Sequence, residues 1–251
     1  MKVARAFIFY LGIAAMALPT FLFIVLSWPL PLRWRWKIAL LWAKFCRPWL
    51  RATVNLQFIL EGREHLPPGP VIYICKHQSA LETILLPGLL YPVVPVLKQE
   101  LLWLPFLGWG LWLLSAIHLQ RKAPQKALVV LKKHAGAMVA KGFSILIFPE
   151  GTRVPPGEQG TYRKGGIWLA KMLDIPIVPI ALNTGLFWPR RSFIKNPGLA
   201  KAVIYPPLYP AEHTLRALQK QIEHTIESGT RALEQEALSM QFDKKSFLTI
   251  Q

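Results

Sequence analysis

The sequence predicts an α/β domain with a mixed, largely parallel sheet flanked by helices, preceded by an N-terminal membrane-associated helical element. From about residue 52 onward, short β-branched or apolar runs alternate with segments of helical character, as in proteins whose strands are separated by helices. The preceding residues instead combine a long uncharged segment with a basic segment that is rich in tryptophan. We therefore expect membrane-anchoring helices at residues 1–51 and an α/β domain at residues 52–251.

The composition indicates a membrane surface. The chain is 53% hydrophobic, yet it has 30 Lys+Arg against 13 Asp+Glu and a net charge of +17. An apolar and basic chain is typical of binding to an anionic phospholipid membrane. Nucleic acid is not expected as a partner, because the aromatic residues cluster in apolar sequence contexts. Cys46 and Cys75 have the spacing of neither a metal site nor a disulfide framework, so we expect a reducing, cytoplasmic setting and no metal.

The first apolar segment, residues 6–32, contains no charged residue and exceeds the roughly 20 residues that cross a bilayer core. Pro19, Pro29 and Pro31 interrupt it, so a kinked span and a re-entrant segment are both open. Residues 15–17 have the small-x-small form of a signal cleavage site, but the residues after them are as apolar as those before. That continuity argues against cleavage.

The next segment has the pattern of a helix at a membrane interface. Arg33, Lys37, Lys44 and Arg47 fall on one side of a helix, and tryptophans and leucines cover most of the remainder. An ordinary solvated helix face is the alternative. If residues 6–32 span, the larger basic cluster after them places the main domain on the cytoplasmic side of the inner membrane.

The elements of the α/β domain follow from periodicity and from turn residues. Strands are expected at residues 54–60, 71–75, 93–97, 116–119, 144–148, 177–182 and 202–205. Helices are expected at residues 80–90, 107–115, 125–141, 166–173 and 214–238. Residues 153–166, rich in Pro, Gly and charge, are the expected mobile loop. Residues 101–116 are apolar all round, which fits buried core, a membrane-contacting patch or the wall of an apolar cavity.

A first candidate site lies where the strand ending at Cys75 gives way to a helix, in the segment KHQSALET at residues 76–83. His77 and Glu82 are five residues apart, which puts them about 140° apart on a continuous helix. They can meet only if His77 lies in the turn and Glu82 in the first helical turn. Glu82 would then fix the tautomer of the imidazole and leave Nε2 free to accept a proton.

The same segment has a purely structural interpretation. Ser79-x-x-Glu82 is a capping box, in which the glutamate binds the backbone N–H of Ser79 and leaves His77 without a partner. The residue types alone do not decide between the two. Neither Cys75 nor Ser79 is favoured as a nucleophile, because Cys75 should point away from Lys76 on a buried strand and Ser79 serves as the cap.

A second candidate site is FPEGTR at residues 148–153, which closes an apolar run. A tight Gly turn, backbone N–H groups and an arginine at a strand end are the parts of a phosphate site. A β-turn with an exposed arginine is the alternative. Residues 163–166 and 118–122 could add further cations.

Taken in order, these motifs resemble the glycerolipid acyltransferase family, specifically the 1-acylglycerol-3-phosphate (lysophosphatidic acid) acyltransferases. The resemblance covers roughly residues 55–205 and rests on five motifs. They are a histidine-x4-acid motif at His77…Glu82, a strand ending in arginine at residues 117–121, FPEGTR at 148–153, an apolar strand with a proline at 178–180, and a spacer at 97–109. Two positions depart from the family pattern. The acid is Glu82 where aspartate is commonest, and Lys76 replaces the usual asparagine.

The resemblance implies acyl transfer from an acyl thioester of coenzyme A or acyl carrier protein to the sn-2 hydroxyl of lysophosphatidic acid, giving phosphatidic acid in phospholipid biosynthesis. His77 would be the general base, and Glu82 would stabilise the imidazolium. It also implies the following substrate-binding residues: Arg121 and Arg153, with the backbone of Gly151 and Thr152, would hold the phosphate, and Glu150 would orient the loop. No metal or organic cofactor is implied.

Other functions remain open at this point. The enzyme could acylate another lysolipid, such as lysophosphatidylglycerol or a lyso-aminolipid, with the same site chemistry. Lipid A late acyltransferases rank third, because they are expected to be longer and to lack FPEGTR. In a different class, the protein would be a catalytically silent membrane lipid-binding protein in which Glu82 is only a cap.

Overall fold

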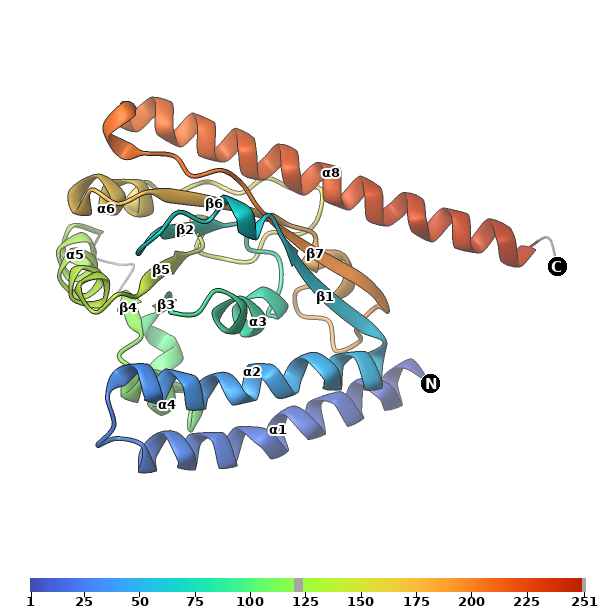
Figure 1. Ribbon diagram of the computed structural model, residues 1–251. Helices are drawn as coiled ribbons and strands as arrows, with labels where there is room; N and C mark the ends of the chain where they lie inside the picture. The colour runs from blue at the N-terminus through green and yellow to red at the C-terminus, as the bar shows by residue number, and fades with distance from the viewer. Residues whose placement is uncertain (120–123, 250–251) are drawn as a thin grey trace.

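The computed structural model describes residues 1–119 and 124–249 (Figure 1). Within these ranges the strands form one sheet of seven, in the order β1-β7-β6-β2-β5-β3-β4. The strands are β1 (Leu56–Glu61), β2 (Ile72–Cys75), β3 (Val93–Lys98), β4 (Ile117–Leu119), β5 (Ser144–Ile147), β6 (Ile177–Leu182) and β7 (Gly198–Ile204). The five strands from β6 to β4 are parallel, whereas β7 runs antiparallel to β6 and pairs in parallel with β1. The predicted mixed, largely parallel sheet is confirmed.

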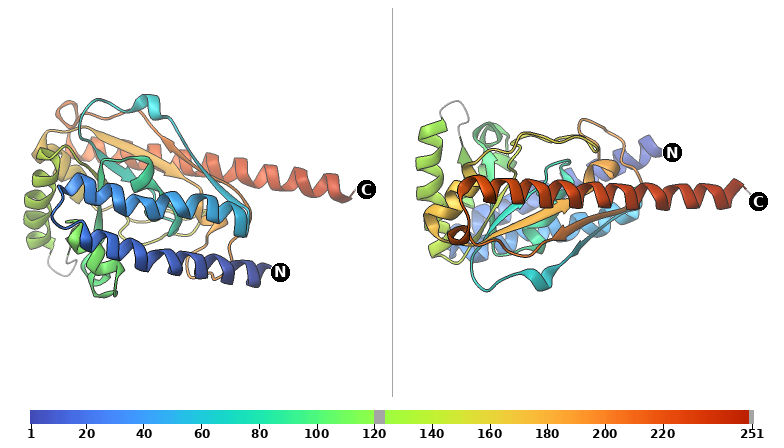
Figure 2. Two further views of the ribbon diagram at one scale, coloured as in Figure 1. Left: turned by 60° about the horizontal axis from the view of Figure 1, so that its bottom comes forward. Right: turned by 90° about the horizontal axis from the view of Figure 1, so that it is seen from above.

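Helices cover both faces of the sheet, as predicted. They are α1 (Lys2–Leu26), α2 (Leu32–Val54), α3 (Leu81–Leu89), α4 (Leu107–Leu113), α5 (Pro124–Ala140), α6 (Gly165–Leu173), α7 (Thr184–Phe187) and α8 (Leu215–Thr249), with short 3-10 helices η1 (Arg63–His65), η2 (Gln99–Trp103) and η3 (Pro210–Glu212). Figures 1 and 2 show α6 and α8 on one face and α3 and α2 on the other, with α1 outside α2. Each predicted strand and helix has a counterpart, but α7 and the 3-10 helices carry no recognisable pattern.

Three predicted boundaries are wrong. The last strand was expected at residues 202–205, but β7 already begins at Gly198, where it pairs with β1. The first strand was expected from residue 54, but α2 continues through Val54 and ends at Asn55, whose left-handed backbone (φ 52°) stops the helix. The last helix was expected to end at residue 238, yet α8 continues to Thr249. The expected division between residues 51 and 52 falls inside α2, and it stays a prediction.

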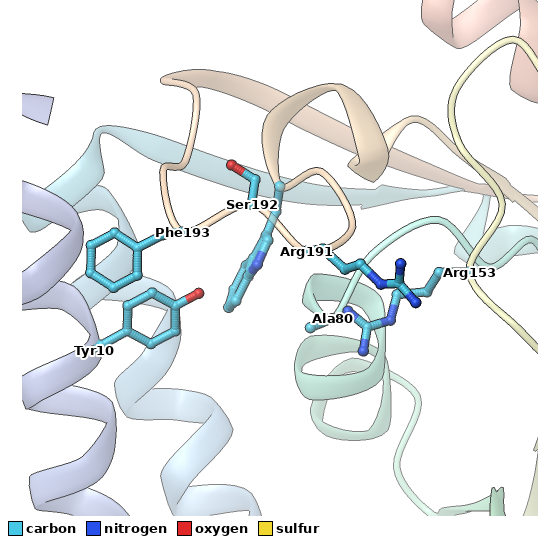
Figure 3. Close-up of a pocket in the computed structure, with 7 residues that line it drawn as sticks. Tyr10, Ala80, Arg153, Arg191, Ser192 and Phe193 are labelled. Carbon is cyan, nitrogen blue, oxygen red and sulfur yellow. The ribbon is translucent and has the colours of Figure 1, made fainter. Parts of the chain in front are cut away.

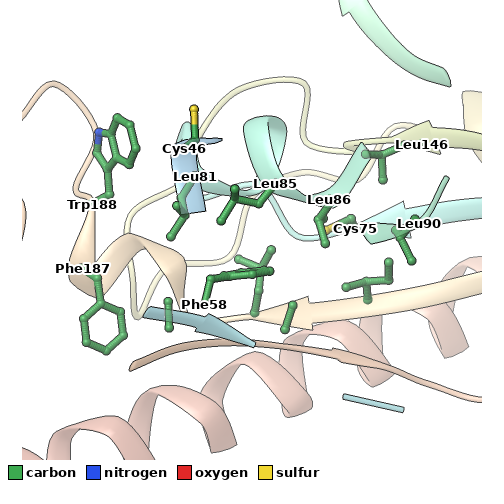
Figure 4. Packing of buried hydrophobic residues seen from close by; sticks show 14 of the residues in the cluster. Cys46, Phe58, Cys75, Leu81, Leu85, Leu86, Leu90, Leu146, Phe187 and Trp188 are labelled. Atoms are coloured by element: carbon green, nitrogen blue, oxygen red, sulfur yellow. The ribbon is translucent and has the colours of Figure 1, made fainter. Parts of the chain in front are cut away.

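Residues of β2 alternate between two cores, one on each side of the sheet. Tyr73 and Cys75 join the cluster on the side of α2 and α3 (Figure 4). Ile72 and Ile74 join the cluster that contains apolar residues of α6 and α8. Strands of a parallel sheet are buried on both faces, so β2 is fully apolar rather than alternating in character. This alternation decides which way the residues after β2 point.

Helices α1 and α2 form a hairpin against the second face. Among the described residues, α1 is the one helix that is long and apolar enough to cross a membrane, judged by length and composition. It contacts the domain near both ends: Phe9 meets Trp188 edge to face, with ring centroids 5.3 Å apart, and Phe21 meets Phe106 at 5.5 Å. The axis of α1 is therefore held along the domain surface.

The predicted basic stripe on α2 is present. Arg33, Lys37, Lys44 and Arg47 are all exposed, while the opposite side of α2 is buried. The apolar segment at residues 101–116 is largely on the surface, where Trp103 is 80% exposed. This exposure argues against a buried core. Leu102, Trp109, Trp112 and Leu113 line a pocket of about 400 Å³, so the membrane-contacting patch and the wall of an apolar cavity both stay predictions.

The close approach of α1 and α2 depends on Gly12. A Cβ at this position would lie 2.3 Å from Nε1 of Trp49, which donates a hydrogen bond to the carbonyl oxygen of Phe9 (3.1 Å). The indole has therefore little freedom to move.

We expect Gly12→Ala to lower the melting temperature in detergent by about 2–10 °C, because the added methyl group pushes the hairpin apart. The matched control is Gly136→Ala on α5, where the nearest atom to the new Cβ lies 3.6 Å away. This control should be neutral or stabilising, since alanine favours a helix over glycine. Equal melting temperatures for the two variants would contradict the tight contact at Gly12.

Candidate active site

The candidate site lies at the carboxyl ends of three adjacent parallel strands. The sheet order β6-β2-β5 places the residues after these strands side by side. His77 follows β2, Glu150 follows β5 and Thr184 follows β6. In α/β sheets, ligands bind at this edge.

His77 and Glu82 are in contact. The Nδ1–H group of His77 donates a hydrogen bond to Oε1 of Glu82 over 2.8 Å. A carboxylate accepts and does not donate, so in the neutral imidazole the proton is on Nδ1 and the lone pair is on Nε2. Glu82 is fully buried, whereas the His77 side chain is 14% exposed. The imidazole also stacks on Phe148, with ring centroids 4.3 Å apart. The geometry predicted for this pair, with histidine in the turn and glutamate in the first helical turn, is what the structure has.

Glu82 also has the capping role, in the same conformation. Its Oε1 accepts hydrogen bonds from the backbone N–H groups of Gln78 (2.9 Å) and Ser79 (2.7 Å). Its Oε2 accepts one from the hydroxyl of Thr184 (2.7 Å). Capping and histidine orientation, which the sequence presented as alternatives, are therefore combined in one carboxylate. Thr184 was missed, because α7 has only four residues and no periodic pattern.

The segment FPEGTR contacts the backbone of His77. Oε2 of Glu150 accepts a hydrogen bond from the His77 N–H (2.8 Å), and the N–H of Val154 donates to the His77 carbonyl oxygen (2.8 Å). Gly151 has a left-handed backbone (φ 67°), and its N–H donates to the carbonyl oxygen of Phe148 (3.1 Å), which closes the expected turn. The loop thus holds the histidine from both sides.

The predicted phosphate-binding residues are partly described. Thr152 is exposed and Arg153 half-buried beside the turn. Arg121 lies outside the described residues. The roles of these residues, and of Gly151 and Glu150, stay predictions.

Lys76 fills a position that sequence reasoning left unexplained. Because side chains alternate along β2, Lys76 points to the same face of the sheet as Ile72 and Ile74. It is fully buried there, on the side of α8. Its Nζ lies 2.9 Å from Oε1 of Glu150 and 2.7 Å from Oε1 of Glu227 on α8. Burial raises the pKa of Glu150, and the charge of Lys76 partly offsets that rise. Lys76 therefore ties α8 to the carboxylate that holds His77.

A second carboxylate of α8 holds the next residue of the turn. Nε2 of Gln78 donates to Oε1 of Glu234 (2.6 Å), and Oε1 of Gln78 accepts from the N–H of Gly185 (3.1 Å). Glu227 and Glu234 are two helical turns apart and so share one face of α8. Both were missed. Each follows directly after an apolar residue of α8, Ile226 or Leu233, so the sequence alone does not distinguish them from solvent-facing acids.

Burial also decides the state of the nearby thiol. The pKa of Cys75 is raised well above its usual value, first by burial and then by the carboxylates of Glu82 and Glu150. A thiol that stays protonated is a poor nucleophile. The described residues contain no group of three or more His, Cys, Asp or Glu side chains placed to hold a metal ion. The expectation that the protein needs no metal or organic cofactor stays a prediction.

Comparison with known proteins identifies the family. A family model described as acyltransferase matches residues 57–183, which contain the histidine-x4-glutamate and FPEGTR segments. A curated 1-acyl-sn-glycerol-3-phosphate acyltransferase from Pseudomonas aeruginosa is 37% identical over 219 residues, covering 85% of this chain and 84% of the relative. The chain belongs to the acyltransferase family.

Other members of the acyltransferase family are more distant. The human 1-acyl-sn-glycerol-3-phosphate acyltransferase alpha is 29% identical over 187 residues, covering 70% of this chain and 65% of that protein. The crystal structure of the 1-acyl-sn-glycerophosphate acyltransferase PlsC from Thermotoga maritima has a TM-score of 0.76 and 23% identity, covering 93% of this chain and 96% of that one. The latter likeness confirms the fold.

We expect Lys76→Met to destabilise the protein by about 3–5 kcal/mol at pH 8, because it leaves two buried carboxylates without their cation. Loss of Lys76 also raises the pKa of Glu150 further above its model-compound value of 4.5. Above pH 4.5 the folded state then keeps a proton that the unfolded state loses, so stability falls as the pH rises through this window. The deficit should therefore shrink as the pH is lowered from 8 toward 5, measured by urea unfolding.

The matched control is Lys171→Met, which removes an exposed lysine of α6. A deficit in Lys76→Met that is independent of pH, or no larger than that of the control, would contradict the assigned network.

Proposed function

We propose that the protein is a membrane-bound acyltransferase that moves a fatty acyl group from an acyl thioester to the sn-2 hydroxyl of 1-acylglycerol-3-phosphate, giving phosphatidic acid in phospholipid biosynthesis. The observation that carries the proposal is the hydrogen bond between His77 and Glu82, which selects the tautomer of the neutral imidazole whose Nε2 can accept a proton, in a member of the acyltransferase family. The relatives from P. aeruginosa and human are named as 1-acyl-sn-glycerol-3-phosphate acyltransferases, which supports lysophosphatidic acid as the acceptor.

In the proposed mechanism, Nε2 of His77 takes the proton of the acceptor hydroxyl as its oxygen attacks the thioester carbonyl carbon. The carbon–sulfur bond then breaks, and the departing thiolate takes the proton from the imidazolium. Glu82 stabilises the imidazolium that forms between these steps, because its negative charge is 2.8 Å from Nδ1. No enzyme nucleophile is needed, since the substrate brings the hydroxyl.

The histidine is fixed before substrate binds. Its backbone is held by Glu150 and Val154, its Nδ1 by Glu82 and its ring face by Phe148. Such positioning lowers the entropic part of the barrier. Arg153, after the same turn, is the proposed contact for the acceptor phosphate, and Arg121 is proposed to assist it. Coenzyme A and acyl carrier protein are both proposed donors, and neither a metal nor an organic cofactor is proposed.

We propose that the α1–α2 hairpin and the patch at residues 101–116 bind the cytoplasmic face of the inner membrane. Contacts near both ends of α1 hold it along the domain, which favours entry into one leaflet with the domain seated on the surface. Indole rings and the basic stripe of α2 belong at such an interface, since each Lys or Arg near an anionic surface contributes about 1 kcal/mol.

The alternatives make different predictions for the same assays. An enzyme for another lysolipid would keep the His77 chemistry and change only the acceptor. A silent lipid-binding protein would transfer no acyl group at all. The deciding experiment offers lysophosphatidic acid, lysophosphatidylglycerol and lysophosphatidylcholine with acyl-coenzyme A and with acyl carrier protein thioesters. Transfer to lysophosphatidic acid that His77→Ala abolishes is the expected result, and no transfer with any pair would refute the enzyme.

We expect Glu82→Gln to lower kcat about 100-fold or more while the melting temperature changes little. The glutamine oxygen can still accept from Gln78 and Ser79, so the helix cap survives, but the charge that stabilises the imidazolium is gone. Steady-state kinetics and thermal unfolding separate the two effects. Near-normal turnover would mean that Glu82 is only a cap.

We expect Trp103→Ser to weaken binding to anionic phospholipid vesicles about tenfold in co-sedimentation, because a largely exposed indole would no longer be buried in the interface. Turnover of detergent-solubilised substrate should stay normal. The matched control is Leu215→Ser at the start of α8, on the other side of the molecule (Figure 1). Equal vesicle binding by both variants would remove Trp103 from the membrane-contacting surface.

A further inference from the structure

A pocket of about 430 Å³ lies beside the start of α3. Its walls come from α1, from the turn after β5 and from the loop that follows α7 (Figure 3). Ala80, three residues after His77, forms part of it. The Val154 N–H donates a hydrogen bond to the His77 carbonyl oxygen, so Arg153, which precedes Val154, is also held close to this turn. The pocket therefore lies near the turn that carries the proposed catalytic histidine.

The two ends of the pocket differ in chemistry. Arg153 and Arg191 line one end, where Figure 3 shows their guanidinium groups next to each other. Tyr10 and Phe193 line the other end and stack with ring centroids 5.1 Å apart, and Trp188 meets Tyr10 edge to face at 6.5 Å. None of the described residues that line the pocket is acidic. It suits a ligand with an anionic group at one end and an apolar part at the other.

The paired arginines call for an anion between them. Among the residues that the structure describes, neither guanidinium group takes part in an ion pair. Two adjacent cations repel each other, and an anion bound between them is attracted to both, which makes the net electrostatic energy of the group favourable. Guanidinium groups bind phosphate through two parallel hydrogen bonds each, so a phosphate monoester fits this end.

The backbone of Arg191 supports a role for its side chain. Arg191 is in the left-handed region (φ 61°), which disfavours every residue with a Cβ and suits glycine. Buried Lys195 fixes the loop around it: Nζ donates to the carbonyl oxygens of Ser192 (2.9 Å) and Phe193 (2.8 Å) and to the hydroxyl of Tyr10 (2.7 Å). An arginine in a position that favours glycine indicates that the guanidinium group is used.

We propose that Arg191 and Arg153 together form the subsite for the phosphate monoester of the acceptor lysolipid, while Tyr10, Trp188 and Phe193 hold the adjoining apolar part. The proposal rests on the proposed function and deepens it. Because Tyr10 belongs to α1, the apolar end of the pocket adjoins the hairpin proposed to enter the membrane. A lysolipid can then keep its chain near the bilayer while its phosphate is held beside His77.

The test is Arg191→Gly, which removes the guanidinium group and relieves the left-handed backbone at once. We expect KM for lysophosphatidic acid to rise about ten- to a hundred-fold, since a charged hydrogen-bonding partner is lost. The melting temperature should stay equal or rise, so a folding defect cannot explain the change. Arg191→Lys, which keeps the charge without the two-pronged geometry, should give an intermediate KM.

The matched control is Arg216→Ala, which removes an exposed arginine of α8 and so the same net charge outside the pocket. Its KM should stay within about twofold of the original protein. An equal rise in Arg216→Ala, or an unchanged KM in Arg191→Gly, would overturn the subsite.

A binding measurement separates this inference from the proposed function. Glycerol 3-phosphate should raise the melting temperature of the unaltered protein and have a much smaller effect on Arg191→Gly. If no lysolipid is acylated but this difference is found, the proposed function falls and the phosphate subsite stands. If lysophosphatidic acid is acylated and both proteins respond alike to glycerol 3-phosphate, the subsite falls and the function stands.

Discussion

The buried carboxylate of Glu82 is the interaction on which the rest of the site depends. A charge without access to water is tolerated only when donors replace its hydration, and here the ring of His77, two backbone N–H groups and the hydroxyl of Thr184 do so. These donors come from the turn after β2 and from α7. The carboxylate that caps the N-terminus of α3 therefore also sets the orientation of the imidazole.

A second charge supports the turn from the opposite side of the sheet. Because the side chains of β2 alternate, Lys76 continues toward α8 while His77 lies on the side of α3. The ion pairs of Lys76 with Glu150 and Glu227 replace water in the same way as the donors around Glu82. The turn that carries His77 is thus held by charged groups on both sides of the sheet, and the ion pairs explain how a lysine is accommodated at a fully buried position.

The sheet, its flanking helices and the position of His77 could be predicted because each depends on a local pattern. Residues whose role depends on distant partners could not. Glu227 and Glu234 look like solvent-facing acids of an amphipathic helix, and only the fold shows that their face is buried. From the sequence, capping and histidine orientation looked like alternatives for Glu82, because a capping-box motif names a single hydrogen-bond partner for the glutamate. In the structure one carboxylate oxygen accepts several hydrogen bonds at once. Arg191 lies in a loop without periodicity, whose conformation depends on the tether at Lys195.

The dependence of the turn on α8 has a consequence for biosynthesis. Lys76 and Gln78 obtain their carboxylate partners 151 and 156 residues further along the chain. During translation, the hairpin proposed to reach the membrane emerges first, and the residues that complete the turn emerge much later. A nascent chain can therefore settle on a bilayer while its charge network is still open. The turn that carries His77 is complete only after the C-terminal helix docks, so the proposed targeting would precede the proposed activity in time.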